Sequence, residues 1–300
     1  MTGATRGIGR ALALAFASEG ADVVVTGKTA TPTPGLPGTI YSVADEVEAL
    51  GVKALPIQLD VRDDKNISDA IDSTVRELGP PAILINNASA LWWKPIEQVR
   101  WVAVGMREPG GSLRQLFVCQ TPMERYDLIM GINARGTFAT TAACLPHMRE
   151  AGWGHVISQS PPITLDKLAG MTAYSMSKFG MTLTALGVAA EYKGRGVAGN
   201  TIWPTTLIES AATKNHQLGD ERHWRKADIL VDAIMHIVHE DPNVFTGNQL
   251  LDEPYLRTKG VTDFTQYRCH PDHEPPHIDS VGKLVMGAGD QSVAKGSKSA

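Results

Sequence analysis

The chain has 300 residues, of which 43% are hydrophobic and 20% are charged, and its net charge is −4 at pH 7. That length and apolar content predict one domain with a full hydrophobic core. The weak negative charge argues against a nucleic-acid-binding protein, because such proteins need a basic surface. No apolar run reaches the roughly 18 residues of a membrane span, and three widely spaced cysteines favour a reducing compartment. We therefore expect a soluble protein, cytoplasmic rather than peroxisomal or mitochondrial.

Short apolar runs alternate with helical patterns along the chain, which predicts a doubly wound parallel sheet of the Rossmann type. The strands are expected at 22–26, 53–58, 82–86, 155–158, 198–203 and 249–252. The helices are expected at 8–19, 39–50, 65–78, 122–150 with a break near Asn133, 172–192 and 227–239. Beyond about Tyr267 the sequence is rich in Pro, His, Gly and Ser. A mobile tail, 268–300, is therefore predicted to follow a domain of residues 1–267.

A glycine pattern, Gly3, Gly7 and Gly9, stands at the start of the first predicted helix. Glycines at this spacing let the backbone turn tightly and approach a dinucleotide pyrophosphate at a helix N-terminus. One cation, Arg6, lies in the loop. Another, Lys28, lies just after the strand predicted at 22–26, where an NAD-specific site would carry an acidic residue. The two cations favour NADP(H), and a merely solvated Lys28 is the alternative.

Tyr174 and Lys178 are four residues apart in the helix predicted at 172–192, so their side chains share one face. A neighbouring ammonium favours the phenolate, so we expect Lys178 to lower the pKa of Tyr174 toward neutrality. Such a pair can transfer protons to and from a substrate. The spacing alone is a weak signal, and it becomes strong because the glycine pattern precedes it.

These motifs together resemble the short-chain dehydrogenase/reductase family over roughly residues 2–267. The matching residues, in family order, are Thr2 to Gly9, Asp60-Val61, Asn86-Asn87-Ala88, Asn133, Tyr174 to Lys178 and Pro204. The hydroxysteroid dehydrogenase-like branch is resembled at Gly27 to Ala30, Gly38 to Tyr41, Ser160-Pro161-Pro162, Trp203-Pro204 and Phe245 to Asn248. The resemblance implies an NADP(H)-dependent enzyme that interconverts a carbonyl and a secondary alcohol on a small apolar substrate. A nucleotide-binding scaffold without turnover and a reductase of an activated C=C bond are the alternatives.

The same resemblance implies roles for individual residues. Tyr174 would give a proton to the carbonyl oxygen, Lys178 would hold the ribose hydroxyls, and Asn133 would support a proton relay through water. The implied cofactor contacts are Gly3, Thr5, Arg6, Gly7, Ile8, Gly9, Lys28, Asp60, Val61, Asn87, Ala88, Tyr174, Lys178, Pro204, Ile208 and Ser210. Two tryptophans, Trp92 and Trp93, either line the substrate side or cover the core.

The serine that polarises the carbonyl in this family is not at its usual position, which Pro161 occupies here. A loop longer by one residue would bring Ser160 to that place, so we predict Ser160 as the catalytic hydroxyl. Ser158 is the alternative, and a site without any serine is a third possibility. In that third case Tyr174 alone would stabilise the oxyanion, at a loss of about 2–4 kcal/mol.

Two segments depart from the family pattern. Residues 99–120 separate Asn87 from Asn133 more widely than in relatives and have no helical or strand periodicity. We interpret them as a translated intron, with a lid over the site as the alternative. At the N-terminus only Met1 precedes the glycine motif, where the family has a central apolar strand. We therefore expect the first strand to be missing and the chain to fold poorly, since neighbouring strands lose hydrogen bonds.

Two further features concern subunit partners and metal binding. The helical stretches 135–150 and 172–192 pair subunits in relatives, so the resemblance implies a homodimer or homotetramer. Near the C-terminus, His270, His273 and His277 lie close to Cys269 and Asp272. This spacing fits no common zinc pattern, so we expect no metal site there.

Overall fold

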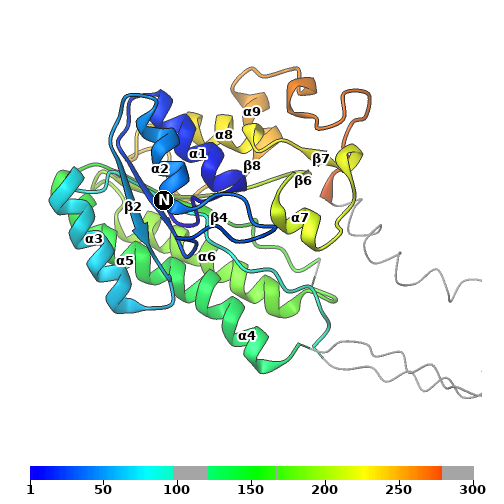
Figure 1. Cartoon of the computed structure of the whole chain (residues 1–300), viewed down its shortest axis with the longest axis horizontal. Coiled ribbons are helices and arrows are strands. Elements are labelled where there is room, and N and C mark those ends of the chain that lie inside the picture. The colour runs from blue at the N-terminus through cyan, green and yellow to red at the C-terminus, as the bar shows by residue number, and fades with distance from the viewer. Residues whose placement is uncertain (97–120, 167, 279–300) are drawn as a thin grey trace, which may run out of the picture.

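The computed structural model describes residues 1–96, 121–166 and 168–278. In this part of the chain, parallel strands lie between two layers of helices (Figure 1). This is the doubly wound α/β architecture that the alternation of strands and helices predicts. The segment interpreted as an insertion, 99–120, lies outside the described residues. On either side of it, Thr121 Oγ1 donates a hydrogen bond to the Pro95 carbonyl oxygen at 3.0 Å.

The central strands form two separate parallel sheets among the described residues. One sheet pairs β1 with β2, and the other has the order β3-β4-β5-β8. Parallel register places Asn86, Ser158 and Thr201 in one row near the carboxyl ends of three strands. The strands are β1 (Val23–Gly27), β2 (Ala54–Gln58), β3 (Ile83–Asn86), β4 (Gly154–Gln159), β5 (Val197–Trp203) and β8 (Gln249–Leu251).

The interruption of the sheet falls between β1 and β3, where the sequence predicts a missing strand. Residues 1–4 bridge this interruption without forming a ladder. The backbone N–H of Thr2 donates to the Ile85 carbonyl oxygen at 3.0 Å, and the N–H of Ala4 donates to the Thr26 carbonyl oxygen at 2.8 Å. These bonds connect both sheets to the start of the glycine loop, and they therefore hold that loop at the carboxyl ends of the strands.

The helices cover both faces of the sheets (Figure 1). Their apolar residues recur at helical spacing, and this pattern turns one side of each helix toward the strands. One layer contains α1 (Gly7–Ser18), α2 (Ile40–Glu48) and α8 (Asp228–Val238). The opposite layer contains α3 (Asp64–Leu78), α5 (Gly136–Ala151) and α6 (Thr172–Glu191).

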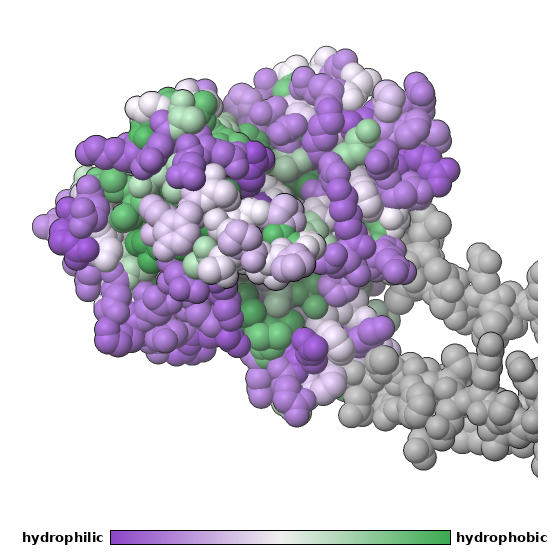
Figure 2. All heavy atoms as spheres, viewed as in Figure 1, coloured by the Kyte–Doolittle hydropathy of each residue, from purple (hydrophilic) through white to green (hydrophobic). Residues whose placement is uncertain are grey.

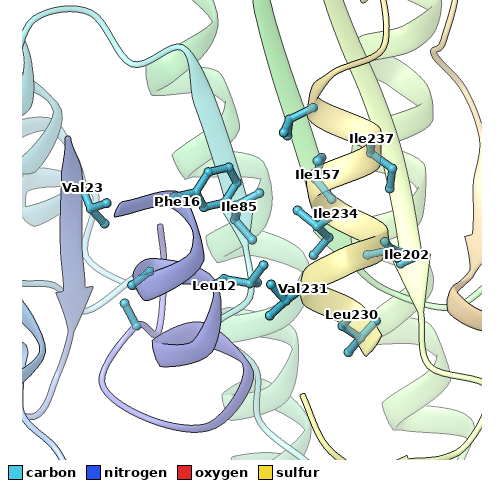
Figure 3. Packing of buried hydrophobic residues seen from close by; sticks show 14 of the residues in the cluster. Leu12, Phe16, Val23, Ile85, Ile157, Ile202, Leu230, Val231, Ile234 and Ile237 are labelled. Atoms are coloured by element: carbon cyan, nitrogen blue, oxygen red, sulfur yellow. The ribbon is translucent and has the colours of Figure 1, made fainter. Parts of the chain in front are cut away.

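The largest hydrophobic cluster lies under α1 and α8 (Figure 3). Leu12 and Phe16, one turn apart on α1, point toward Ile85 of β3. On α8, Ile234 lies in the same cluster, together with residues of β4 and β5. Burying one such side chain contributes about 1.5–3 kcal/mol, so this cluster fixes the sheet against the helix that follows the glycine loop.

The helical stretch predicted at 122–150 is interrupted as expected. It consists of α4 (Met123–Ile129), the π-helix η1 (Met130–Arg135) and α5, and Asn133 lies within the π-helix. Such π-helical turns often mark functional sites. The remaining elements are short: β6 (Leu207–Ile208), α7 (Ala211–Asn215), η2 (Glu221–His223), β7 (Trp224–Arg225), α9 (Asp252–Thr258) and η3 (Thr265–Tyr267).

Residues 268–278 run along the segment that follows β5. The backbone N–H of Cys269 donates to the Trp224 carbonyl oxygen at 3.2 Å, and that of Ile278 donates to the Thr205 carbonyl oxygen at 2.8 Å. The domain boundary predicted at 267 therefore falls inside a hydrogen-bonded segment. The rest of the expected tail, 279–300, lies outside the described residues.

The surface in Figure 2 is mainly hydrophilic, with hydrophobic side chains gathered in a smaller area below its centre. Within residues 1–96, 121–166 and 168–278, every helix is too short or too polar to cross a membrane. The polar surface agrees with a chain whose apolar residues are mostly enclosed between sheet and helices.

Candidate active site

The predicted site residues gather at the carboxyl ends of the parallel strands, where α/β proteins bind their ligands. The glycine loop itself needs glycine at several positions. Gly3 and Gly7 have φ angles of +68° and +53°, which other residues rarely adopt. A Cβ atom on Gly9 would lie 2.2 Å from the Gly3 carbonyl oxygen, so no side chain fits there. At Gly7 the nearest atom to an added Cβ would be Cβ of Ser210, at 3.8 Å, so the backbone angle rather than the space favours glycine there.

Asn87 connects the glycine loop to the end of β3. Its Nδ2 donates to the carbonyl oxygens of Thr2 at 3.0 Å and Gly3 at 2.9 Å. The backbone N–H groups of Asn87 and Ala88 both donate to Thr2 Oγ1 at 3.0 Å. The structure thus brings together the two motifs predicted to contact the cofactor, and the polar atoms of Asn87 are used to shape the loop.

The predicted cations lie beside β1 and the loop after it. Arg6 Nη2 donates to Thr29 Oγ1 at 2.8 Å. Lys28 Nζ lies 3.0 Å from Asp60 Oδ2, which also accepts from Arg62 at 2.6 Å. Hydrogen bonds from Arg62, and then from Lys28, hold the pKa of Asp60 below its usual range against the opposing effect of burial. Lys28 therefore has a carboxylate neighbour that was not predicted from the sequence. Lys28 and Arg62 share this single carboxylate, Asp60.

Tyr174 and Lys178 lie on one face of α6 and are both buried, at 6% and 3% exposure. Lys178 Nζ donates to the Gln159 carbonyl oxygen at 2.9 Å and lies 5.1 Å from the centroid of the Trp203 ring. Burial lowers the pKa of Lys178 to about 7. Burial also raises the pKa of Tyr174 above its ordinary value, because the phenolate loses hydration. The expected lowering of the Tyr174 pKa is therefore wrong for this geometry, in which burial shifts that pKa upward.

Asn133 is completely buried and uses both ends of its amide. Its Nδ2 donates to the Ala90 carbonyl oxygen and to Ser177 Oγ, each at 2.9 Å, and its Oδ1 accepts from the Ala90 N–H at 2.8 Å. Ser177 Oγ in turn donates to the Tyr174 carbonyl oxygen at 2.7 Å. Asn133 thus joins the π-helix, the segment after β3 and the helix that carries Tyr174.

Ser160 lies apart from Tyr174. Its Oγ accepts a hydrogen bond from Thr182 Oγ1 at 2.9 Å, and the Thr182 hydroxyl also lies within hydrogen-bond distance of the Pro161 carbonyl oxygen, at 2.8 Å. Thr182 follows Tyr174 by two turns of α6, which places it about 12 Å further along the helix axis. The alternative, Ser158, is buried in β4, and its Oγ has no hydrogen-bond partner among the described residues. The structure brings neither serine into hydrogen-bond contact with Tyr174.

Trp93 contacts Tyr174 on the side of the segment after β3. The two rings meet edge to face, with centroids 6.0 Å apart and an angle of 75° between their planes. Trp93 also packs on an apolar cluster that we call the outer cluster. The members of the outer cluster are Leu91, Trp93, Leu207, Leu218, Trp224 and Cys269. The surroundings of the Tyr174 ring are therefore apolar.

Comparison with known proteins identifies the family. A family model described as short chain dehydrogenase matches residues 1–220, which contain the glycine loop, Asn133, Tyr174 and Lys178. The chain belongs to the short-chain dehydrogenase family. This membership confirms the resemblance that the sequence motifs predict.

Similar proteins agree with this membership. Hydroxysteroid dehydrogenase-like protein 2 from Danio rerio is 41% identical over 278 residues, and the protein of that name from Homo sapiens is 39% identical over the same length. The present short-chain dehydrogenase spans about three fifths of these relatives, 61% and 60% of their lengths. A crystal structure of a short-chain dehydrogenase from Mycobacterium thermoresistibile has 39% identity and a TM-score of 0.79, covering 92% of this chain and 91% of that one.

In this short-chain dehydrogenase, a buried carboxylate fixes the segment after β5 that contains Pro204. Asp252, the first residue of α9, accepts from the Thr205 N–H at 2.8 Å and from Thr205 Oγ1 at 2.5 Å. Burial raises the pKa of Asp252. Further along, Ser210 caps α7, and its Oγ accepts from the Thr213 N–H at 3.2 Å. The contact of Asp252 with Thr205 could not be predicted from the sequence, because the two residues are 47 positions apart.

A buried ion-pair network lies next to this segment. Arg225, whose side chain is 1% exposed, pairs with Glu253 of α9 at 2.6 Å and with Glu274 of the C-terminal segment at 2.5 Å. No sequence pattern identified these residues, because their partners are distant along the chain. The network connects β7 to α9 and to residues 268–278. It thereby stabilises the strand that contains Trp224, a member of the outer cluster. Within the described residues, no group of three or more His, Cys, Asp or Glu side chains could hold a metal ion.

Proposed function

We propose that this short-chain dehydrogenase is an NADP(H)-dependent enzyme that interconverts a carbonyl and a secondary alcohol on a small apolar molecule. The observation that carries the proposal is the arrangement of Tyr174 and Lys178 on one face of α6. Both lie beside the carboxyl ends of the parallel strands, where the glycine loop also lies. A buried phenol next to a buried ammonium is suited to proton transfer at a carbonyl oxygen.

The cofactor would be held by residues from both sides of the sheet end. The glycine loop before α1 would bind the pyrophosphate at the N-terminus of that helix. Lys178 has the donors to bind ribose hydroxyls, and Pro204 and Ile208 lie on the segment that Asp252 fixes. When bound, the reduced nicotinamide supplies a hydride to the carbonyl carbon. The proposed cofactor contacts are those predicted from the sequence.

Tyr174 is the proposed acid. Its raised pKa keeps the phenol protonated across the neutral range, so its hydroxyl has a proton to give. As the C=O bond is reduced, this proton moves to the carbonyl oxygen and the O–H bond electrons remain on the phenolate. The ammonium of Lys178, on the same helix face, favours that phenolate. In the reverse direction the phenolate accepts the proton of the alcohol.

A preference for NADP(H) over NAD(H) is supported by the charges next to β1. Arg6, Lys28 and Arg62 are three cations in a region where Asp60 is the carboxylate that Lys28 and Arg62 share. A 2′-phosphate would add the negative charge that this region lacks. Lys28 is 61% exposed at its side chain, so its contact with Asp60 is weak and can be exchanged for a phosphate contact.

An apolar substrate is supported by the outer cluster. Trp93 packs both against the ring of Tyr174 and against the cluster of Leu207, Leu218 and Trp224. A substrate whose carbonyl lies at the Tyr174 hydroxyl would extend its remaining atoms over these side chains. Apolar groups gain free energy on leaving water for such a surface.

Ser160 stays a predicted catalytic residue, although its hydroxyl contacts Thr182. If it polarises the carbonyl, the loop that contains Pro161 must move toward Tyr174 when ligands bind. A Ser160→Ala variant tests the role, and unchanged turnover would eliminate it. The contact between Ser160 and Thr182 also favours the alternative of a nucleotide-binding scaffold without turnover. With Ser160 held there, the substrate carbonyl would lack the serine as a hydrogen-bond donor.

The deciding experiment supplies NADPH carrying deuterium at C4 of the nicotinamide, with a panel of apolar ketones and aldehydes. Deuterium on the carbinol carbon of the product supports carbonyl reduction. Tight cofactor binding without turnover on any compound favours the scaffold, and deuterium on a saturated carbon next to an intact carbonyl favours reduction of a C=C bond.

A further inference from the structure

The ring of Trp93 packs against the ring of Tyr174, the proposed acid. The two rings form an edge-to-face pair with centroids 6.0 Å apart, which is within the range of contacting aromatic pairs. The Tyr174 side chain is 6% exposed. Little of the Tyr174 side chain is open to water, and the indole of Trp93 is one of the groups that cover its ring.

The indole N–H of Trp93 is buried and has no hydrogen-bond partner among the described residues. Buried donors are nearly always paired in native proteins, and an exception calls for an explanation such as a role in catalysis. Tryptophan can only donate, so its missing partner must be an acceptor. A carbonyl oxygen is such an acceptor. Trp92 also has an unpaired N–H among the described residues, but its ring centroid lies 5.1 Å from the Arg125 guanidinium carbon. It is Trp93 whose ring pairs with Tyr174.

Other candidate donors are absent or lie in other contacts, apart from Ser158 Oγ, which lies within β4 and has no partner among the described residues. Pro161 stands at the family's serine position and has no side-chain donor. The hydroxyl of Ser160 is bound by Thr182, about two helical turns beyond Tyr174. The amide of Asn133 donates to Ala90 and Ser177. The outer cluster keeps the surroundings of Trp93 apolar, and a hydrogen bond to a developing oxyanion is strongest in such surroundings.

We propose that the Nε1–H of Trp93 donates a hydrogen bond to the substrate carbonyl oxygen and stabilises its negative charge in the transition state. Trp93 would thereby be a catalytic residue that takes the part usually played by a serine. It exchanges no proton: Tyr174 gives the proton, and Trp93 only polarises the C=O bond. The inference rests on the proposed carbonyl reduction, because it assigns the second donor to that same oxygen.

The test compares Trp93→Phe with the matched variant Trp92→Phe in the whole chain. Phenylalanine keeps an aromatic ring against Tyr174 and removes the N–H. For Trp93→Phe we expect kcat to fall about 100-fold with little change in KM, the order of loss when one oxyanion donor is removed. We expect Trp92→Phe to keep the unmodified kcat. NADPH binding and the melting midpoint, measured for both variants, show whether either has simply lost its fold.

Each other outcome is informative. If the unmodified enzyme reduces ketones and Trp93→Phe does so equally fast, the inference is wrong while the proposed function stands. A raised KM with unchanged kcat would make Trp93 an apolar wall only, and a 100-fold loss in Ser160→Ala alone would return the role to the serine. If the unmodified enzyme reduces no carbonyl, both proposals fail.

A second measurement does not depend on the variant being active. The indole N–H of Trp93 is observed by ¹⁵N-edited NMR of the unmodified enzyme and assigned by the resonance that disappears in Trp93→Phe. NADP⁺ together with the best ketone of the panel forms a complex that cannot react. A downfield shift of the Trp93 proton in this complex, absent with NADP⁺ alone, supports the hydrogen bond, and an unmoved resonance contradicts it.

Discussion

The ammonium of Lys178 donates a hydrogen bond to the main-chain carbonyl oxygen of Gln159 at 2.9 Å. It lies at the carboxyl end of β4, and the ring of Trp203 provides a second, weaker attraction at 5.1 Å. Burial nevertheless lowers the pKa of Lys178 to about 7, so part of the population is neutral at neutral pH. A ligand that accepts a hydrogen bond from the Lys178 ammonium should therefore increase the protonated fraction of Lys178.

The first prediction concerns proton uptake on cofactor binding. Ribose hydroxyls that accept from the ammonium favour its charged form, so binding should raise the Lys178 pKa from about 7 toward the ordinary value of 10.5. Between these two pH values the free enzyme lacks the proton and the complex holds it, so NADPH binding should take up protons at pH 8. Calorimetry in two buffers of different ionisation enthalpy measures this uptake. The same uptake in Lys178→Met would contradict the assignment.

The second prediction concerns the choice of cofactor. Replacing Lys28 by Asp removes a cation and adds a carboxylate that can accept from a ribose hydroxyl, so the preference for NADPH should narrow or reverse. Arg6→Gln should weaken NADPH at least about tenfold, as expected for a lost charged hydrogen bond, and leave NADH unchanged. Arg76→Gln is the matched control, because Arg76 lies in the last turn of α3 and pairs with Glu77. Equal affinity of the unmodified chain for both cofactors would sink this prediction.

Much of the fold could be predicted because its signals are local. The helix expected at 172–192 is α6, which spans Thr172–Glu191, and the strand expected at 198–203 is β5, which spans Val197–Trp203. Apolar runs and helical periodicity identify such elements without knowledge of their neighbours. The Tyr174–Lys178 pair was found in the same way, since four-residue spacing on a helix fixes its geometry.

Other parts depend on residues far apart in sequence. The two-residue strands β6 and β7 are too short to show any periodicity. Asp252 contacts Thr205, and Thr182 contacts Ser160, only because the fold brings them together. The pKa of Tyr174 was predicted with the wrong direction for the same reason. Spacing revealed the neighbouring cation, whereas burial, which has the larger effect here, is set by tertiary packing.

The third prediction concerns stability. Asn133→Ala removes three hydrogen bonds of a buried amide and leaves the Ala90 N–H and carbonyl groups without these partners. We expect a loss of about 2–4 kcal/mol in the free energy of unfolding. Ser177→Ala removes one bond of this set and should cost about 1 kcal/mol. Denaturant unfolding of both variants measures the difference, and equal losses would show that Asn133 does not organise the site.

The fourth prediction concerns subunit association through α5 and α6. Phe138 and Leu183 lie on these helices with 65% and 59% exposure, so a partner subunit that packs on α5 and α6 would cover them. We expect a homodimer or homotetramer, and Phe138→Lys with Leu183→Lys should reduce its mass. Val244→Lys is the control, since Val244 is 79% exposed but lies outside both helices. Light scattering that gives a monomeric mass for the unmodified chain would contradict the prediction.

The most direct test of the whole account is the rate of hydride transfer in Tyr174→Phe. Phenylalanine keeps the ring that packs on Trp93 and removes only the hydroxyl that gives the proton. In a single turnover with deuterated NADPH and a ketone that the unmodified enzyme reduces, we predict unchanged NADPH affinity and a hydride-transfer rate at least about 100-fold lower. A variant that binds NADPH and transfers hydride at the unmodified rate would show that Tyr174 is not the acid.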